Sequence, residues 1–242
     1  MEGCSSTIVY LSEEEDDAQE TKRLVEEKGG KLWLQTTNLK ESRNCKEVVE
    51  KAIKDMGRIN ILVNNHGYQM MKKDISDLSE YVQCLITRLE TDFTDTTIHR
   101  EQWEHTFQTN IHPFFYLSKY VLPQMKSGDT IINCASINAY IGRPDLLDYT
   151  STKGAIVSFT RGLSNQVVSK GIRVNAVCPG PVWTPLIAAT MDKEAQEQFT
   201  SPMGRPGQPA EIATNFVFLA SKDSSFISGQ SLHPNGGTII NG

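Results

Sequence analysis

Short β-rich runs alternate with amphipathic helical patterns along the whole chain. "STIVYL", "KLWLQTTN" and "INILVNN" are separated by "DDAQETKRLVEEKG" and "NCKEVVEKAIKDMG", and the strand-like runs "TIINCAS", "GIRVNAVCPG" and "SLHPNGG" follow further on. Parallel strands need a long crossover between them, usually a helix, so this alternation predicts an α/β fold. We expect a doubly wound parallel sheet covered by helices.

Length and charge limit the number of domains and the kind of partner. With 242 residues, 38% of them apolar, the chain has the size of one domain spanning 1–242. The formal net charge is −5, and no block of lysine or arginine interrupts the sequence. This balance argues against a nucleic acid or an anionic membrane as a partner and leaves a small molecule.

The chain carries neither a membrane anchor nor a secretory signal that we recognise. No segment reaches the roughly 18 consecutive apolar residues of a membrane span, and "MEGCSSTIVYL" lacks the regions of a signal peptide. The cysteines are odd in number and far apart, without a CxxC pair: Cys4, Cys45, Cys84, Cys134 and Cys178. We therefore expect a cytoplasmic protein with reduced thiols and no metal site.

Polar and turn-forming residues gather where three predicted strands end. Asn64-Asn65-His66-Gly67 follows "INILV", Ser136 closes "TIINCAS", and "PGPVWT" follows "GIRVNAVC". Ligands of parallel α/β sheets bind at these carboxyl ends. Each stretch alone is an ordinary turn, but their order and spacing favour a site.

Tyr149 and Lys153 stand four residues apart at the start of a helical pattern. Positions i and i+4 share one face of a helix, so both side chains can reach the same space. A nearby ammonium lowers the pKa of a tyrosine and makes proton transfer to or from an alcohol or ketone feasible. An isolated YxxxK is more often an exposed surface pair, so other residues must decide.

Ser136 and Asn110 are two such residues. Ser136 lies thirteen residues before Tyr149, and a loop can bring its hydroxyl beside the phenol, where both would bracket a substrate carbonyl. Asn110, inside "QTNIHPFF", is unfavourable within a helix because its amide competes for backbone hydrogen bonds. A functional reason for this asparagine is therefore plausible.

Over nearly its whole length the chain resembles the short-chain dehydrogenase/reductases, with "NNHG", Asn110, Ser136, "YTSTK" and "PGPVWT" in family order. The resemblance implies a Rossmann-like sheet and hydride transfer to or from NAD or NADP. It implies that Tyr149 is the general acid/base and that Lys153 lowers its pKa and holds the nicotinamide ribose. Ser136 would polarise the substrate oxygen, and Asn110 would support a proton-relay water.

The same resemblance implies further cofactor-binding residues. They are Asn64, Asn65 and Gly67 along the cofactor, Val182 and Thr184 at its carboxamide, and Lys119 and Asn38 near it. Asn38 stands where a family aspartate touches adenine, and an amide can still form a hydrogen bond there. His66 replaces the usual alanine, and its side chain either crowds the cofactor or turns aside.

The choice between NAD and NADP stays open. Residues just after the family's second strand distinguish the two cofactors. Here "YLSEEED" offers Glu13 for a ribose 2′-OH, and no arginine stands nearby to pair with a 2′-phosphate. This pattern leans toward NAD. The same acidic residues also suit the positive end of a following helix, which weakens that inference.

The nearest subgroup is similar to bacterial glucose-dehydrogenase-like and general-stress oxidoreductases, through "RPDLLDYTSTKGAIVSFTR", "GPVWTPLI" and "PMGRPGQPAEIA". The likeness implies interconversion of a secondary alcohol and a ketone and leaves the substrate open, a sugar being one alternative. Residues 185–206 would form a substrate lid, whose apolar side chains either line the pocket or pack in the core. "GQSLHPNGG" resembles a subunit contact and implies a homo-tetramer or dimer.

The chain has no GxGxxG turn between a strand and a helix, although such a turn supplies the N–H donors for a pyrophosphate. "MEGCSSTIVYL" is similar to the family's entry into its second strand, so we expect the first strand and helix to be missing. Either the chain starts at an internal methionine of a longer enzyme, which we favour, or it is a catalytically silent binding protein. As printed, it should bind nicotinamide cofactors weakly.

Residues 81–100, "YVQCLITRLETDFTDTTIHR", interrupt the family spacing, which is restored when they are removed. They form a lid insertion, a surface loop, or the translation of a retained intron. Twenty residues correspond to sixty in-frame nucleotides, and their codons can supply splice-site and branch-point sequences, so we favour the intron. This would imply a eukaryotic gene and a dedicated pathway for secondary metabolites such as terpenoids or polyketides.

Overall fold

The computed structural model describes residues 3–78 and 102–240, so the expected insertion at 81–100 lies outside the described residues. The strands are β1 (Ser5–Tyr10), β2 (Lys31–Thr36), β3 (Ile61–Asn64), β4 (Thr130–Cys134), β5 (Arg173–Val177) and β6 (Ser231–Leu232). The helices are α1 (Glu15–Glu27), α2 (Ser42–Met56), α3 (Gln102–Asn110), α4 (His112–Val121), α5 (Asn138–Ile141), α6 (Leu147–Val167), α7 (Pro185–Thr190), α8 (Lys193–Glu197) and α9 (Pro209–Ala220).

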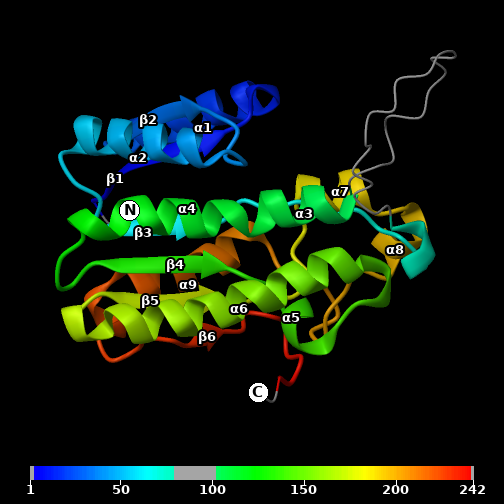
Figure 1. The fold of residues 1–242 in the computed structure, drawn as a ribbon. Helices are drawn as coiled ribbons and strands as arrows, with labels where there is room; N and C mark the ends of the chain where they lie inside the picture. The colour runs from blue at the N-terminus through cyan, green and yellow to red at the C-terminus, as the bar shows by residue number, and fades with distance from the viewer. Residues whose placement is uncertain (1–2, 79–101, 241–242) are drawn as a thin grey trace, which may run out of the picture.

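The strand pairing confirms the predicted Rossmann-like α/β class. β1 pairs with β2, while β3, β4, β5 and β6 form a second sheet in that order, and all pairs are parallel. Within the described residues no ladder hydrogen bonds join the two sheets, as expected for a fold without the family's first strand. In Figure 1 the β1–β2 unit lies beside β3 and α4, at the end of the molecule away from β6.

The core is centred on β4 and β5. Ile131 and Val174 point to one face of the sheet, where they pack with residues of α2, α4 and α6. Ile132 and Val177 point to the other face, where they pack with Leu219 of α9. Both strands are therefore buried on both faces, as is typical of parallel sheets covered by helices.

Helix α2 connects the two sheets. Its buried residues Cys45, Val48, Val49 and Ala52 recur at helical spacing and pack in one cluster with the α4 residues Leu117 and Val121. A hydrogen bond of 2.8 Å between Ser42 Oγ and Tyr120 Oη runs alongside this contact. Side-chain packing therefore takes the place of backbone pairing between the β1–β2 unit and the larger sheet.

Two sequence expectations differ in length from the observed elements. The last predicted strand, "SLHPNGG", pairs only at Ser231 and Leu232, because Pro234 has no N–H and Gly236 and Gly237 have positive φ angles. The stretch "EQWEHTFQTNIHPFFYLSKYVLPQM" divides into α3 and α4 just before Pro113, which cannot donate to the preceding helical turn.

Neither a membrane helix nor a metal cluster is present in the described part of the chain. No described helix is both long and apolar enough to cross a bilayer. Within residues 3–78 and 102–240, no three His, Cys, Asp or Glu side chains gather in a way that would hold a metal ion.

Arg173 holds the carboxyl end of α9 against β5. The guanidinium is buried and donates to Ser224 Oγ at 2.8 Å, to the carbonyl of Leu219 at 2.8 Å and to that of Ser221 at 3.2 Å. These carbonyls end a helix and have no partner within it, so a cation there is favourable. Burial lowers the pKa of Arg173, yet the three acceptors keep its charge satisfied.

We predict that Arg173→Met lowers the free energy of unfolding by about 2–4 kcal/mol, because buried acceptors lose their charged donor. Urea unfolding followed by circular dichroism measures the change. Arg23→Met, which removes two exposed helical ion pairs on α1, with Glu20 and Glu27, serves as the control and should change stability by less than about 1 kcal/mol. Equal effects of the two variants would contradict the anchoring role of Arg173.

Candidate active site

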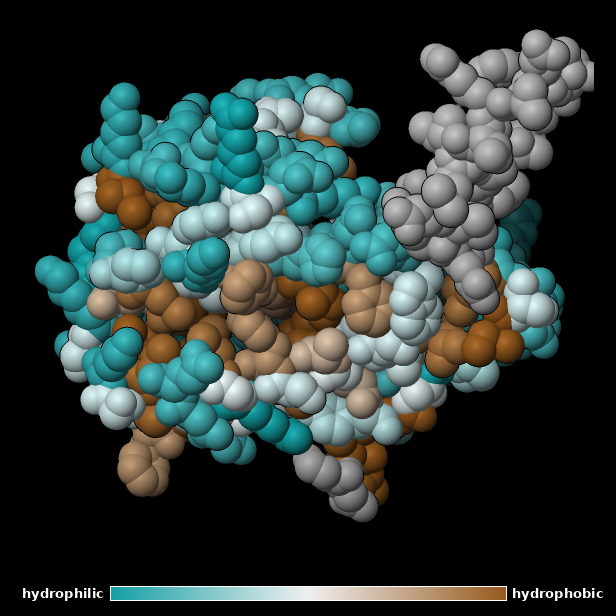
Figure 2. Space-filling view, viewed as in Figure 1, coloured by the Kyte–Doolittle hydropathy of each residue, from teal (hydrophilic) through white to brown (hydrophobic). Residues whose placement is uncertain are grey.

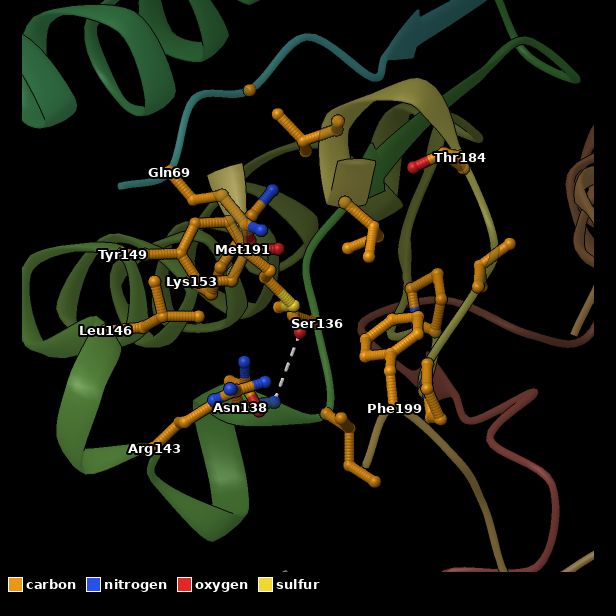
Figure 3. A pocket seen from close by; sticks show the side chains of 18 of the residues that line it. Gln69, Ser136, Asn138, Arg143, Leu146, Tyr149, Lys153, Thr184, Met191 and Phe199 are labelled. Carbon is orange, nitrogen blue, oxygen red and sulfur yellow. Dashed lines mark hydrogen bonds between the residues drawn. The ribbon is translucent and has the colours of Figure 1, made fainter. Parts of the chain in front are cut away.

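A cavity of about 1090 Å³ opens at the carboxyl ends of β3, β4 and β5. Loops after these strands, the start of α6, the α7–α8 segment and the first turns of α9 form its walls (Figure 3). The structure brings many of the predicted site residues to this cavity: Asn65, Gly67, Ser136, Tyr149, Lys153, Val182 and Thr184. The strand-end loops therefore meet, as their order along the chain indicated.

Tyr149 and Lys153 lie on one face of α6, as the i, i+4 spacing predicted. Lys153 Nζ sits 5.3 Å from the centroid of the Tyr149 ring and donates a hydrogen bond of 2.9 Å to the carbonyl of Cys134. The lysine is 3% exposed, so its charge acts on the phenol across little water. The structure therefore places a buried ammonium beside the phenol ring.

Ser136 lies in the loop after β4 and faces the same cavity. Its Oγ accepts a hydrogen bond of 3.2 Å from the backbone N–H of Asn138, drawn as a dashed line in Figure 3. Because that bond uses a lone pair and not the hydroxyl proton, Ser136 can still donate to a substrate oxygen.

Asn110 ends α3, is fully buried, and uses its side chain within the protein. Its Oδ1 accepts from the backbone N–H of Tyr68 at 2.7 Å, and its Nδ2 donates to the carbonyl of Tyr68 at 2.9 Å and to Thr152 Oγ1 at 3.0 Å. The amide thus joins the loop after β3 to helix α6, which carries Tyr149 and Lys153. Its unfavourable place in a helix has this structural explanation.

Three predicted cofactor-binding residues do not line the cavity. Asn64 is buried and donates to Asn133 Oδ1 at 2.9 Å, while its own Oδ1 has no partner among the described residues. Asn38 lies after β2, where its Oδ1 accepts from the backbone N–H of Lys40. Lys119 extends along α4 over the rings of Phe115 and Tyr120.

His66 turns away from the cavity. Its ring packs edge-on against Phe114 of α4 at a centroid distance of 4.6 Å, and its Nε2 is buried without a hydrogen-bond partner in the described part of the chain. Burial, together with the nearby charge of Lys153, lowers the pKa of His66 to about 3. Of the two alternatives left by the sequence, this geometry favours the side chain that turns aside.

Asp148 is a site residue that the sequence reasoning missed. Its carboxylate is fully buried and accepts from Thr106 Oγ1 at 2.7 Å, Gln102 Nε2 at 3.0 Å and the backbone N–H of Tyr149 at 2.8 Å. These bonds fix the first turn of α6 against α3. A carboxylate directly before the catalytic tyrosine was a signal for this role.

The expected lid at 185–206 both packs and lines the cavity. Ile187 and Met191 are buried and cluster with Leu146, with Tyr149 and Phe199 packed against them. The same side chains face the cavity. The two alternatives offered by the sequence, pocket wall and core packing, are thus properties of one set of residues.

Comparison with known proteins places this geometry in a family. The family model described as enoyl-(acyl carrier protein) reductase matches residues 1–238. The chain is 48% identical over 241 residues to an uncharacterized oxidoreductase of Schizosaccharomyces pombe and 46% identical over 249 residues to the glucose and ribitol dehydrogenase of Daucus carota. These alignments cover 99% and 100% of this chain and 77% and 79% of the two relatives.

Solved structures agree with the sequence relatives. A short-chain dehydrogenase/reductase of the glucose/ribitol dehydrogenase type from Brucella melitensis superposes with a TM-score of 0.79 at 28% identity, covering 99% of this chain and 88% of that one. The chain therefore belongs to the short-chain dehydrogenase/reductase family of oxidoreductases.

Proposed function

We propose that this chain catalyses NAD(P)-dependent interconversion of a secondary alcohol and a ketone. The observation that carries the proposal is the convergence of Tyr149 and Ser136 on one cavity, with the buried ammonium of Lys153 beside the tyrosine ring. A bound nicotinamide would supply or accept the hydride. Everything else in the reaction is proton transfer and orientation by protein side chains.

Each catalytic side chain has a role that its contacts allow. Tyr149 gives its phenol proton to the substrate oxygen in reduction and removes it in oxidation. Lys153 stabilises the phenolate left behind, because its charge is buried and held by the Cys134 carbonyl. Ser136 donates its free hydroxyl proton to the same substrate oxygen and fixes its position.

The residues present fit the nicotinamide end of a dinucleotide. Asn65 and Gly67 after β3, and Val182 and Thr184 after β5, line the cavity beside Tyr149 and Lys153. They offer hydroxyl, amide and backbone groups suited to a ribose and a carboxamide. We assign them to cofactor binding, and Asn64 and Asn110 to the support of the loop that carries Asn65 and Gly67.

The alternative, a catalytically silent binding protein, has one observation in its favour. No GxGxxG turn is present in the sequence, so the N–H donors that usually hold a pyrophosphate are missing from this chain. Fluorescence titration with NADH and NADPH separates the two candidates. Turnover with either cofactor supports the enzyme, whereas a folded chain that binds neither supports the silent protein.

The expectations about the choice of cofactor, the substrate, the pathway and the location stay predictions. The choice between NAD and NADP is open, and Glu13 lies at an exposed position near the start of α1. A sugar substrate is supported by the name of the carrot relative. The secondary-metabolite pathway depends on residues 81–100, outside the described part of the chain. A cytoplasmic location is also still a prediction.

A homo-oligomer is supported by apolar side chains on one face. Trp103, Phe115, Leu147 and Val168 are exposed on or beside α3, α4 and α6. Figure 2 shows apolar residues gathered on this face, whereas hydrophilic residues cover the β1–β2 unit. We propose a dimer or tetramer that covers this face.

We predict that Tyr149→Phe lowers kcat by about 10²–10⁴-fold and leaves cofactor affinity nearly unchanged, because only the transferable proton is removed. Steady-state kinetics and NAD(P)H fluorescence measure the two effects. Tyr116→Phe on α4, outside the cavity lining, is the matched control. A Tyr149→Phe enzyme with more than half of the original activity would rule out the mechanism.

We predict that Asn110→Ala lowers both cofactor affinity and the free energy of unfolding, the latter by about 2–3 kcal/mol, since buried groups of Tyr68 and Thr152 lose their partners. Asn110→Asp keeps the acceptor and loses both donors, so it should rescue little. Urea unfolding and fluorescence titration give the two readouts. Normal stability with impaired turnover would instead indicate that Asn110 acts only in proton relay.

We predict that sedimentation equilibrium shows a dimer or tetramer and that Phe115→Glu shifts it toward monomer. A charge at this half-exposed position would be buried without compensation in an apolar interface. Circular dichroism checks that the variant is folded. A monomeric parent chain would contradict the proposed assembly.

A further inference from the structure

Among the polar side chains that line the cavity without a part in the proton transfer, three are held in place by hydrogen bonds or an ion pair. They are Gln69 after β3, and Arg143 and Asp145 in the segment between α5 and α6. In Figure 3 Gln69 lies above Tyr149 and Arg143 lies below it, and Ser136 lies between them toward the centre of the view. Each is held by the protein before any substrate arrives.

Gln69 is 3% exposed, and its amide orientation is fixed by Thr190 of α7. Thr190 Oγ1 donates its only proton to the carbonyl of Leu186 at 2.6 Å, so toward Gln69 it can only accept. Gln69 Nε2 donates to it at 2.9 Å. The carbonyl oxygen of the Gln69 amide therefore remains as an acceptor for a ligand.

Arg143 and Asp145 form a bidentate ion pair. Arg143 Nε donates to Asp145 Oδ1 at 2.6 Å and Nη2 donates to Oδ2 at 2.9 Å, which leaves the Nη1 edge for other acceptors. The carbonyl of Asp145 accepts from the backbone N–H of Lys72 at 2.9 Å, so the pair is tied to the loop after β3. The fork is preorganised and has no net charge.

The charges around these groups do not favour an anionic substrate. Two lysines, Lys73 and Lys153, line the cavity, but so do the carboxylates of Asp192 and Glu194 from the lid. A carboxylate or phosphate would meet a guanidinium that is already neutralised, together with these acidic groups. A neutral hydroxyl, in contrast, can accept from Arg143 Nη1 and donate to Gln69 or Asp145.

We propose that Gln69 and the Arg143–Asp145 pair are specificity-determining residues that bind an additional hydroxyl group of a neutral substrate. Apolar residues of the lid, Ile187, Met191 and Phe199, pack on its carbon skeleton. This inference rests on the proposed function and deepens it. The cavity then has two roles. Tyr149 and Ser136 bind the reacting oxygen, and Gln69 with the Arg143–Asp145 pair binds a neighbouring hydroxyl group of the substrate.

Two alcohols that differ by one hydroxyl test the subsite: cyclohexanol and vicinal cyclohexanediol. We expect kcat/KM of the full chain to favour the diol by about tenfold or more, because a site built for a hydroxyl discriminates against an analogue without it. Arg143→Met and Gln69→Leu should each bring the ratio close to one. Arg58→Met removes another arginine–aspartate pair, with Asp129, outside the cavity lining and the lid, and should keep the ratio.

The outcomes separate this inference from the proposed function. If cyclohexanol is oxidised and the diol has no advantage, the subsite is wrong while the enzyme assignment holds. If neither alcohol is oxidised by a folded chain with bound cofactor, the proposed function itself fails. Preference for a cyclohexanol with a vicinal carboxylate over the diol would overturn the selection of neutral substrates. Arg143→Lys, which keeps the charge and loses the fork, is the second variant if Arg143→Met does not fold.

Discussion

The carboxamide of Asn110 holds together the segments on which the candidate site depends. It bonds both backbone groups of Tyr68 and the hydroxyl of Thr152, so one side chain fixes the loop after β3 and the catalytic helix α6. Thr152 in turn donates to the carbonyl of Tyr149 at 2.7 Å. Because Asn110 and Thr152 are fully buried, any displacement leaves an unpaired donor or acceptor away from water. The position of Gly67 and of Tyr149 is therefore set by a single buried network.

Buried charge shapes the rest of the site. Lys153 keeps an ammonium at 3% exposure with a backbone carbonyl as its bonded acceptor, which makes its positive field strong at the Tyr149 ring. His66 shares this region and remains neutral, since a second positive charge there would be repelled as well as poorly solvated. The carboxylate of Asp148 is held by neutral donors on α3 and by the backbone N–H of Tyr149. The chain thus places the ammonium of Lys153 directly beside the phenol ring.

The sequence predicts the parts of this structure that depend on periodicity and local spacing. The parallel strands, the shared face of Tyr149 and Lys153, and the meeting of strand-end loops all follow from rules of period and topology. The direction in which a particular side chain points does not follow from these rules. The hydrogen bond of Gln69 to Thr190 joins residues far apart in the chain. The ring of His66 points away from the cavity because it packs on Phe114 of α4. The position of Asn38 outside the cavity also depends on tertiary packing, which no local sequence pattern encodes.

In the described part of the chain no ladder hydrogen bonds join the two sheets, and each sheet carries a different group of the predicted cofactor-binding residues. The nicotinamide-side residues, from Asn65 to Thr184, all belong to loops of the larger sheet and its helices. Asn38, the candidate for the adenine side, belongs to the β1–β2 unit. One dinucleotide must contact both to be held at each end. Their relative position depends on the packing of α2 against α4, centred on Val48, Val49, Leu117 and Val121. The core contact between these two helices therefore sets how Asn38 and the residues proposed for the nicotinamide side lie relative to each other.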